Sequence, residues 1–183
     1  MFSIQDIPLI HSFAPIEDTD AKVLILGSMP GKESLKAGQY YAHHGNAFWT
    51  IMGDLIGAKP TLSYELRIQK LKASSIALWD VLASCSRHSS LDADIDKYSI
   101  ATNDFETFFS IHSNITHVFF NGAMAEKSFH KHLKCTLESR VLQYQRLPST
   151  SPTHASMTYS QKLTAWKVIK ETEHIKCSLL ANS

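Results

Sequence analysis

The chain has 183 residues, of which 44% are hydrophobic, and a formal net charge of +1. These values predict one compact domain over residues 1–183, and the net charge alone does not favour a nucleic-acid partner. No apolar run reaches the roughly 18 residues that span a bilayer and the N-terminus lacks a basic start, so we expect no membrane span and no signal peptide. The three cysteines are widely spaced, which excludes a disulfide framework or a zinc or iron–sulfur ligand set.

The first half of the chain predicts two strands and two helices. Residues 23–26 form an all-apolar run that ends at Gly27, which is typical of a strand buried on both faces. A helix is predicted from Asn46, a favoured N-cap residue, to Gly57, a plausible stop signal. Apolar residues at helical spacing predict a further helix from residue 64. Residues 76–82 form the second predicted strand, and residues 84–90 a polar loop.

In the second half of the chain, predicted strands and helices continue to alternate. Asn103 and Glu106 have the spacing of a capping box that opens a short helix. Residues 115–121 are predicted as a third strand, followed at once by a glycine and a helix. Residues 141–147 are predicted as a fourth strand, and a last helix begins near Tyr159.

Four strands that alternate with helices predict an α/β fold. The expected architecture is a three-layer α/β/α sandwich with a central four-stranded parallel sheet. The loops that follow parallel strands gather at the carboxyl edge of the sheet, where such proteins bind ligands. We therefore expect the turns at 27–31, 80–88 and 147–155 to converge on one cleft.

Positive charge is concentrated in one part of the chain. Residues 125–170 contain eight Lys or Arg and two acidic residues, which gives this segment a charge of +6. A basic face on an otherwise neutral protein fits modest contact with nucleic-acid phosphates. Ordinary solvated helix faces explain the same residues equally well on charge alone.

Three segments carry the candidate chemistry. The turn Gly27-Ser28-Met29-Pro30-Gly31 matches neither a phosphate-binding GxxxxGK[ST] loop nor GxGxxG. Of the adjacent Tyr40 and Tyr41, one can pack in the core while the other stacks on a base, although both can equally be loop anchors. Asn46 is explained as a helix cap, and its amide can also hold a water molecule.

The loop at 147–155 combines two prolines with several small hydroxyl residues. Hydroxyl and backbone N–H groups are suited to gripping a nucleic-acid backbone. Ser151 and His154 also suggest a serine-hydrolase pair, but no GxSxG motif accompanies them, so this alternative is disfavoured.

Five blocks occur in a characteristic order: GSMPG at 27–31, YYAHHGNAFW at 40–49, LWDVLASCSRHSSLDADI at 78–95, VFFNG at 118–122 and LPSTSPTHA at 147–155. Together they resemble the uracil-DNA glycosylase superfamily, and most closely its branch of hypoxanthine-DNA (deoxyinosine) glycosylases. Related mismatch-specific enzymes carry an Asn in the first turn that positions the attacking water, whereas Met29 stands at this place here. In the hypoxanthine branch catalysis is thought to rest on an Asn outside this turn, and Asn46 is the matching residue.

The resemblance implies a role for each segment. It implies that Asn46 is catalytic, that Tyr41 stacks on a flipped base and that Asp80 accepts a hydrogen bond from this base. It further implies a base pocket formed by Gly27, Ser28, Met29, Pro30, Tyr41 and Asp80. A loop in the DNA minor groove, with His154 contacting phosphate, would be formed by Ser149, Ser151, Pro152, Thr153 and His154. Asn121 also matches a family position, although a strand-end cap explains it equally well.

The function implied by the resemblance is a monofunctional DNA glycosylase that excises hypoxanthine and so initiates base-excision repair. The alternatives are a uracil- or mismatch-specific glycosylase of the same fold and a non-catalytic protein that binds damaged DNA. We expect DNA with a deaminated base as the partner, no membrane contact, a monomer, and no cofactor or metal. No lysine is evident at the pocket for lyase chemistry, so an abasic site is the expected product. A cytoplasmic, nucleoid-associated location follows from this substrate.

Overall fold

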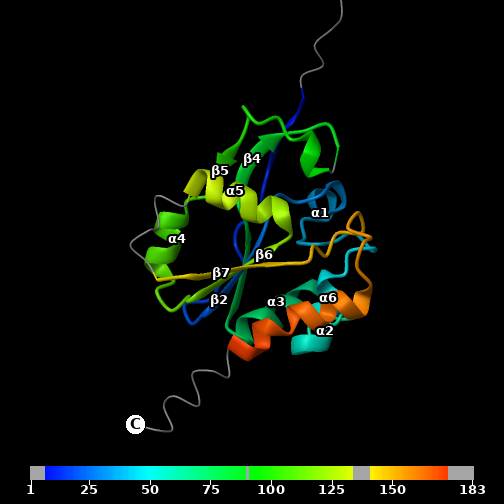
Figure 1. Cartoon of the computed structure of the whole chain (residues 1–183), viewed down its shortest axis with the longest axis vertical. Helices are drawn as coiled ribbons and strands as arrows, with labels where there is room; N and C mark the ends of the chain where they lie inside the picture. Colours follow the sequence, from blue (N-terminus) through cyan, green and yellow to red (C-terminus); the bar gives the residue numbers. More distant parts are fainter. Residues whose placement is uncertain (1–6, 90, 134–140, 173–183) are drawn as a thin grey trace, which may run out of the picture.

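The computed structural model describes residues 7–89, 91–133 and 141–172 (Figure 1). Its central sheet consists of four parallel strands in the order β3 (Ile76–Asp80), β2 (Val23–Gly27), β6 (His117–Asn121) and β7 (Gln143–Leu147). The predicted four-stranded parallel sheet is therefore confirmed. All residues of β2 and β3 are buried. This is expected for the interior strand β2, and the outer edge of β3 is covered at Leu78 by an antiparallel bridge to Ile16.

Helices cover both faces of this sheet, because alternate residues of each strand point to opposite sides. Leu24 and Leu26 pack in one apolar cluster, and Val23 and Ile25 pack in the other. The first face is covered by α4 (Phe105–Ile111) and α5 (Ala123–Leu133). The second is covered by α2 (Phe48–Ile56), α3 (Tyr64–Ala73) and α6 (Tyr159–Trp166), which lie together in Figure 1. The α/β/α layering is confirmed.

A second, antiparallel sheet was not predicted. It is formed by β1 (Leu9–His11), β4 (Leu82–Ser86) and β5 (Ala101–Thr102), with β4 in the middle. The predicted strand at 76–82 therefore ends at Asp80, and the predicted polar loop at 84–90 begins with residues of β4. The sequence of β4, LASCS, has little strand pattern of its own, so its conformation depends on pairing with its neighbours.

Two predicted helix caps differ in detail. The N-cap of α4 is Asp104, whose side chain accepts a hydrogen bond from the Thr107 N–H, so the capping box predicted from Asn103 is wrong. Asn103 instead donates from Nδ2 to the Asp80 carbonyl oxygen at 2.8 Å. Helix α2 begins at Phe48, two residues after the predicted start. The α2 stop signal at Gly57 is confirmed by its left-handed φ of 75°.

The basic segment does not form one face in the part of the chain that the structure describes. Helices α5 and α6 carry most of its described lysines but pack on opposite faces of the central sheet. Lys162 is only 6% exposed, and Arg146 forms an ion pair of 3.1 Å with Glu126. Two of the predicted basic residues, Lys134 and Arg140, lie outside the described residues. The prediction of a single basic face is therefore wrong for the described part.

Two predictions from composition can be compared with the described residues. Cys85 is buried and free, whereas Cys135 and Cys177 lie outside this part of the chain. Among the described helices, none has the length and apolar character needed to cross a membrane.

Candidate active site

The carboxyl edge of the central sheet borders a cavity of about 810 Å³. The first turn, the segment after α1 (Lys32–Ala37) and the loop after β7 all contribute to its wall. The prediction of one cleft is confirmed for the turns at 27–31 and 147–155. From the predicted third turn at 80–88, Asp80 alone lines the cavity, because the chain then leaves as β4 and returns at Leu91 and Asp92.

The floor of the cavity is formed where Gly27, Asp80 and Tyr41 meet. Asp80 is 3% exposed, and its Oδ2 accepts a hydrogen bond from the Ser12 hydroxyl at 3.2 Å. An ideal Cβ atom built on Gly27 would lie 2.4 Å from Asp80 Oδ1 and 2.9 Å from the Tyr41 hydroxyl oxygen. Only glycine therefore leaves room for both polar groups at the end of β2.

The environment of Asp80 favours its neutral form. Burial is the main cause that raises the pKa of this carboxyl to about 7, and the nearby Asp92 carboxyl raises it further. The hydrogen bond from Ser12 and the charge of Arg87 act in the opposite direction. Near neutral pH the carboxyl can therefore donate as well as accept a hydrogen bond. The family resemblance implied that Asp80 accepts a hydrogen bond from the base, and the raised pKa adds the ability to donate one.

Replacing Asp80 by asparagine is expected to change how stability depends on pH. The pKa of Asp80 is about 7 in the folded protein against 3.8 for an exposed carboxyl, so the folded state binds the proton more tightly. The stabilisation of the folded state by this proton is complete below about pH 4. It falls by about 1.4 kcal/mol per pH unit between about pH 4 and about pH 7. Urea unfolding at about pH 5 and about pH 8 should show the wild type losing stability relative to Asp80→Asn. An unchanged difference between the two proteins would contradict the raised pKa.

The two adjacent tyrosines occupy different environments. Tyr40 is 3% exposed and packs in the core, and its hydroxyl donates to the Ala14 carbonyl oxygen at 3.1 Å. Tyr41 is half-buried and lines the cavity, and its ring stacks on Phe48 with a centroid distance of 4.1 Å. Its φ of 54° is uncommon for a residue with a side chain. Such strained positions concentrate at functional sites.

Asn46 has both a structural contact and access to the cavity. Its Oδ1 accepts a hydrogen bond of 3.0 Å from the Phe48 N–H at the start of α2, although the N-cap position is occupied by Ala47 and not by Asn46 as predicted. The side chain is half-buried and lines the cavity, and its Nδ2 has no hydrogen-bond partner among the described residues. In the first turn, Met29 is 7% exposed and packs in the core while also lining the cavity. The amide that could orient water therefore comes from Asn46.

The first turn is fixed by residues that follow β4. The Ser28 hydroxyl lies 2.9 Å from each carboxylate oxygen of Asp92. Arg87 is 4% exposed and donates a hydrogen bond from Nη2 to the Pro30 carbonyl oxygen. Burial raises the pKa of Asp92, whereas the Ser28 hydrogen bond and the charge of Arg87 lower it. Asp92 and Arg87 belong to the block at 78–95 but were not predicted as site residues.

The loop after β7 is tied to the sheet and to α2. Asn121 donates from Nδ2 to the Thr150 hydroxyl at 2.9 Å, and its Oδ1 accepts from the Thr150 N–H at 2.9 Å. The Ala47 N–H donates to the Thr150 carbonyl oxygen at 3.0 Å. Asn121 therefore holds the loop, in agreement with its interpretation as a strand-end cap. The Ser151 hydroxyl bonds to the Thr153 hydroxyl at 2.8 Å rather than to the His154 ring, so no serine-hydrolase pair forms.

Replacing Asn121 by alanine is expected to lower the free energy of unfolding by about 1–3 kcal/mol, because two Thr150 groups lose their partner. Asn121→Asp is the matched control, since it keeps an oxygen that can accept from the Thr150 N–H. Urea unfolding measures the loss, and amide hydrogen exchange at Thr150 shows whether it is local. A Thr150 amide that stays equally protected in Asn121→Ala would contradict this role.

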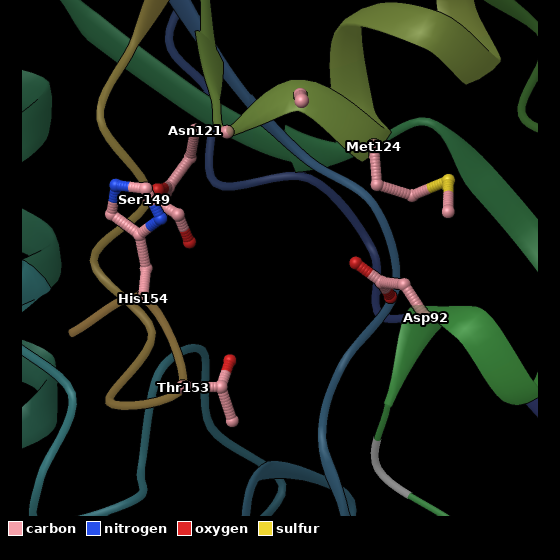
Figure 2. Close-up of a pocket in the computed structure, with 8 residues that line it drawn as sticks. Asp92, Asn121, Met124, Ser149, Thr153 and His154 are labelled. Carbon is pink, nitrogen blue, oxygen red and sulfur yellow. The ribbon is translucent and has the colours of Figure 1, made fainter. Parts of the chain in front are cut away.

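A smaller cavity of about 200 Å³ adjoins the first at the start of α5. Figure 2 shows Ser149 and His154 on one side of it, and Asp92 and Met124 on the other. The predicted loop residues thus divide between the two cavities. The larger one is lined by Ser149, Ser151, Pro152 and Thr153, and the smaller one by Ser149, Thr153 and His154. The predicted turn residues Gly27, Ser28, Met29 and Pro30 all line the larger cavity.

The chain belongs to the uracil DNA glycosylase superfamily, because the model of this family matches residues 14–172. It is 38% identical over 113 residues to a hypoxanthine DNA glycosylase of Methanosarcina barkeri, covering 61% of this chain and 70% of the relative. It is 37% identical over 116 residues to a protein of the same name from Methanosarcina acetivorans, covering 63% of this chain and 72% of the relative. A solution NMR structure of a candidate uracil DNA glycosylase from Methanosarcina acetivorans superposes with a TM-score of 0.71 at 28% identity, covering 89% of this chain and 99% of that chain.

Proposed function

We propose that this protein is a monofunctional DNA glycosylase that removes hypoxanthine, the product of adenine deamination, from DNA. The observation that carries the proposal is the identity of 38% and 37% to two relatives named hypoxanthine DNA glycosylase. The cavity supports it, because a volume of about 810 Å³ accommodates a flipped nucleotide. Cleavage of the glycosidic bond in such a cavity would initiate base-excision repair.

The groups on the cavity wall suit a flat, polar base. Tyr41 has one ring face on Phe48, and the other can stack on the base, an interaction worth about 1–3 kcal/mol. The neutral form of Asp80 can donate to a ring nitrogen or the carbonyl oxygen of hypoxanthine, while its second oxygen accepts from N1–H. The backbone N–H groups of Ser28 and Met29 donate to no atom of the described residues, so they can stabilise charge on the departing base.

The reaction is hydrolysis of the bond between C1′ of deoxyribose and N9 of the base. The electron pair of this bond leaves with the base, and the sugar acquires oxocarbenium character. A water molecule held by the Asn46 amide forms the new bond to C1′, and positioning is the main contribution that a neutral amide can make. The water loses one proton and the base takes one up, so an abasic site and free hypoxanthine result.

The smaller cavity suits a DNA phosphate beside the flipped nucleotide. It lies at the N-terminus of α5, where backbone N–H groups favour an anion. The Asp92 carboxylate is on the opposite side of this cavity from Ser149 and His154, so a phosphate would lie on the side of these two residues (Figure 2). Ser149 and His154 line this cavity and can donate to phosphate oxygens. Pro152 and Thr153 are exposed beside it and would face the minor groove. The protein would act as a monomer on DNA in the cytoplasm, at the nucleoid.

Excision from matched duplexes tests the proposal. The duplexes carry one inosine, one uracil or only normal bases, and alkali converts each abasic site to a strand break. Breaks at inosine support hypoxanthine excision, and breaks at uracil alone would favour the uracil-specific alternative. Binding to the inosine duplex without release of free base would favour the alternative of a non-catalytic DNA-binding protein.

A further inference from the structure

Asp92 lies in the wall that separates the two cavities. Four residues line both of them, namely Asp92, Asn121, Ser149 and Thr153. Asp92 alone among these four has a side chain that can carry a charge. Figure 2 shows its carboxylate directed into the smaller cavity, across from Ser149 and Thr153. Asp92 therefore places an acidic group at the junction of the two spaces.

The junction corresponds to a particular part of a bound nucleotide, if the proposed function is correct. A flipped nucleotide has its base in the larger cavity and its phosphate at the start of α5 in the smaller one. Deoxyribose connects base and phosphate, so the wall shared by the cavities faces the sugar. Positive charge develops on this sugar when the glycosidic bond breaks.

The other shared side chains are neutral and each already has a hydrogen-bond partner in the protein, although the Ser149 hydroxyl can still donate its proton. Both ends of the Asn121 amide bond to Thr150, and the Ser149 hydroxyl accepts from the Ser151 N–H at 3.2 Å. The Asp92 carboxylate has only the Ser28 hydroxyl as a hydrogen-bond donor and forms no ion pair with the described side chains. Its remaining lone pairs are thus available to a cation in the cavity.

We propose that Asp92 is a second catalytic residue, whose carboxylate stabilises the positive charge of the deoxyribose during base excision. The C1′–N9 bond breaks and its electron pair goes to the base, while the carboxylate lies next to the sugar that becomes cationic. Water then forms the bond to C1′ and releases one proton, and the base anion takes up one. No group besides water, carboxylate and substrate is required. Asp92, which belongs to the block at 78–95, is the one acidic residue of the described chain that lines both cavities.

The test compares two DNA ligands that cannot be cleaved. One carries a protonated pyrrolidine in place of the sugar, which mimics the cation, and the other a neutral tetrahydrofuran. We expect the wild type to bind the pyrrolidine DNA at least about tenfold more tightly than the tetrahydrofuran DNA. Asp92→Asn should lose most of this preference and excise hypoxanthine about 10- to 100-fold more slowly in single-turnover assays.

Asparagine is chosen because its Oδ1 can still accept the hydrogen bond from Ser28 and so keep the first turn in place. Asp94→Asn is the matched control, since it removes the same charge from the same short helix, η1 (Asp92–Asp94), at an exposed residue that lines neither cavity. This control should retain both the binding preference and the excision rate.

If Asp92→Asn keeps both the preference for the pyrrolidine DNA and the wild-type excision rate, Asp92 only fixes the turn and the proposal is overturned. Excision of hypoxanthine by the wild type is measured in parallel. A wild type that releases no hypoxanthine refutes the proposed function, whereas an unchanged binding ratio in Asp92→Asn refutes the role of Asp92 alone.

Discussion

Replacing Asn46 by alanine is expected to lower the single-turnover rate of hypoxanthine excision by at least about 100-fold. Asn46 lines the larger cavity, and its amide is the group that we expect to orient the attacking water. Binding of a duplex with a non-cleavable inosine should change much less than the rate, because the loss concerns the transition state.

The hydrogen bond that Asn46 provides at the start of α2 complicates this substitution. Asn46 Oδ1 accepts from the Phe48 N–H, and loss of such a hydrogen bond at a helix start costs about 1 kcal/mol of stability. Asn46→Ser separates the two roles, because a serine hydroxyl can still accept from this N–H but cannot replace the amide. We expect the serine variant to unfold at nearly the urea concentration of the wild type and to be as slow as the alanine variant. If either variant excised hypoxanthine at the rate of the wild type, the catalytic role assigned to Asn46 would be refuted.

Replacing Gly27 by alanine is expected to reduce excision by more than about 100-fold, since a displacement of about 1 Å at a reacting centre has an effect of this size. The added Cβ would lie 2.4 Å from Asp80 Oδ1 and 2.9 Å from the Tyr41 hydroxyl. Both groups must move, because both distances are shorter than a Cβ contact allows. Overpacking of this kind also lowers stability by about 1–3 kcal/mol.

Gly31→Ala is the matched control for Gly27→Ala, because no atom lies within 4 Å of its added Cβ. Both positions belong to the same turn, and both substitutions add one methyl group. We expect the control to keep its unfolding free energy and most of its activity. Equal losses of activity in the two variants would show that the turn backbone, rather than the space next to Asp80, is what the reaction requires.

The central sheet could be predicted because its strands carry their own signal. The apolar run that ends at Gly27 is buried on both faces, which sequence alone indicates well. Gly27 could be placed at the cavity because it ends a predicted strand, whereas Asp80 stood inside the predicted strand at 76–82 and was placed in the site by the family resemblance. Pairing of the two positions in adjacent strands then brings them together.

The remaining parts of the site depend on contacts between segments far apart in the sequence. Strand β4 has a weak pattern, so its departure from the central sheet after Asp80 was not predictable. For the same reason, the return of the chain to the cavity at Asp92 was not predicted. Ser12 reaches Asp80 across 68 positions of sequence, and no local pattern reveals such a contact. The prediction of a single basic face was wrong because charge along a sequence does not indicate on which side of a sheet a helix packs.

The two hydrogen bonds that Asp80 receives from outside the central sheet have a consequence for cooperativity. Ser12 follows β1 and Asn103 follows β5, so both donors come from chain that leaves the small antiparallel sheet. The larger cavity has its complete floor only while this small sheet is docked on the large one. Local opening of these edge strands would thus switch the enzyme off without unfolding the main core. We therefore expect activity to be lost at a lower denaturant concentration than the global fold.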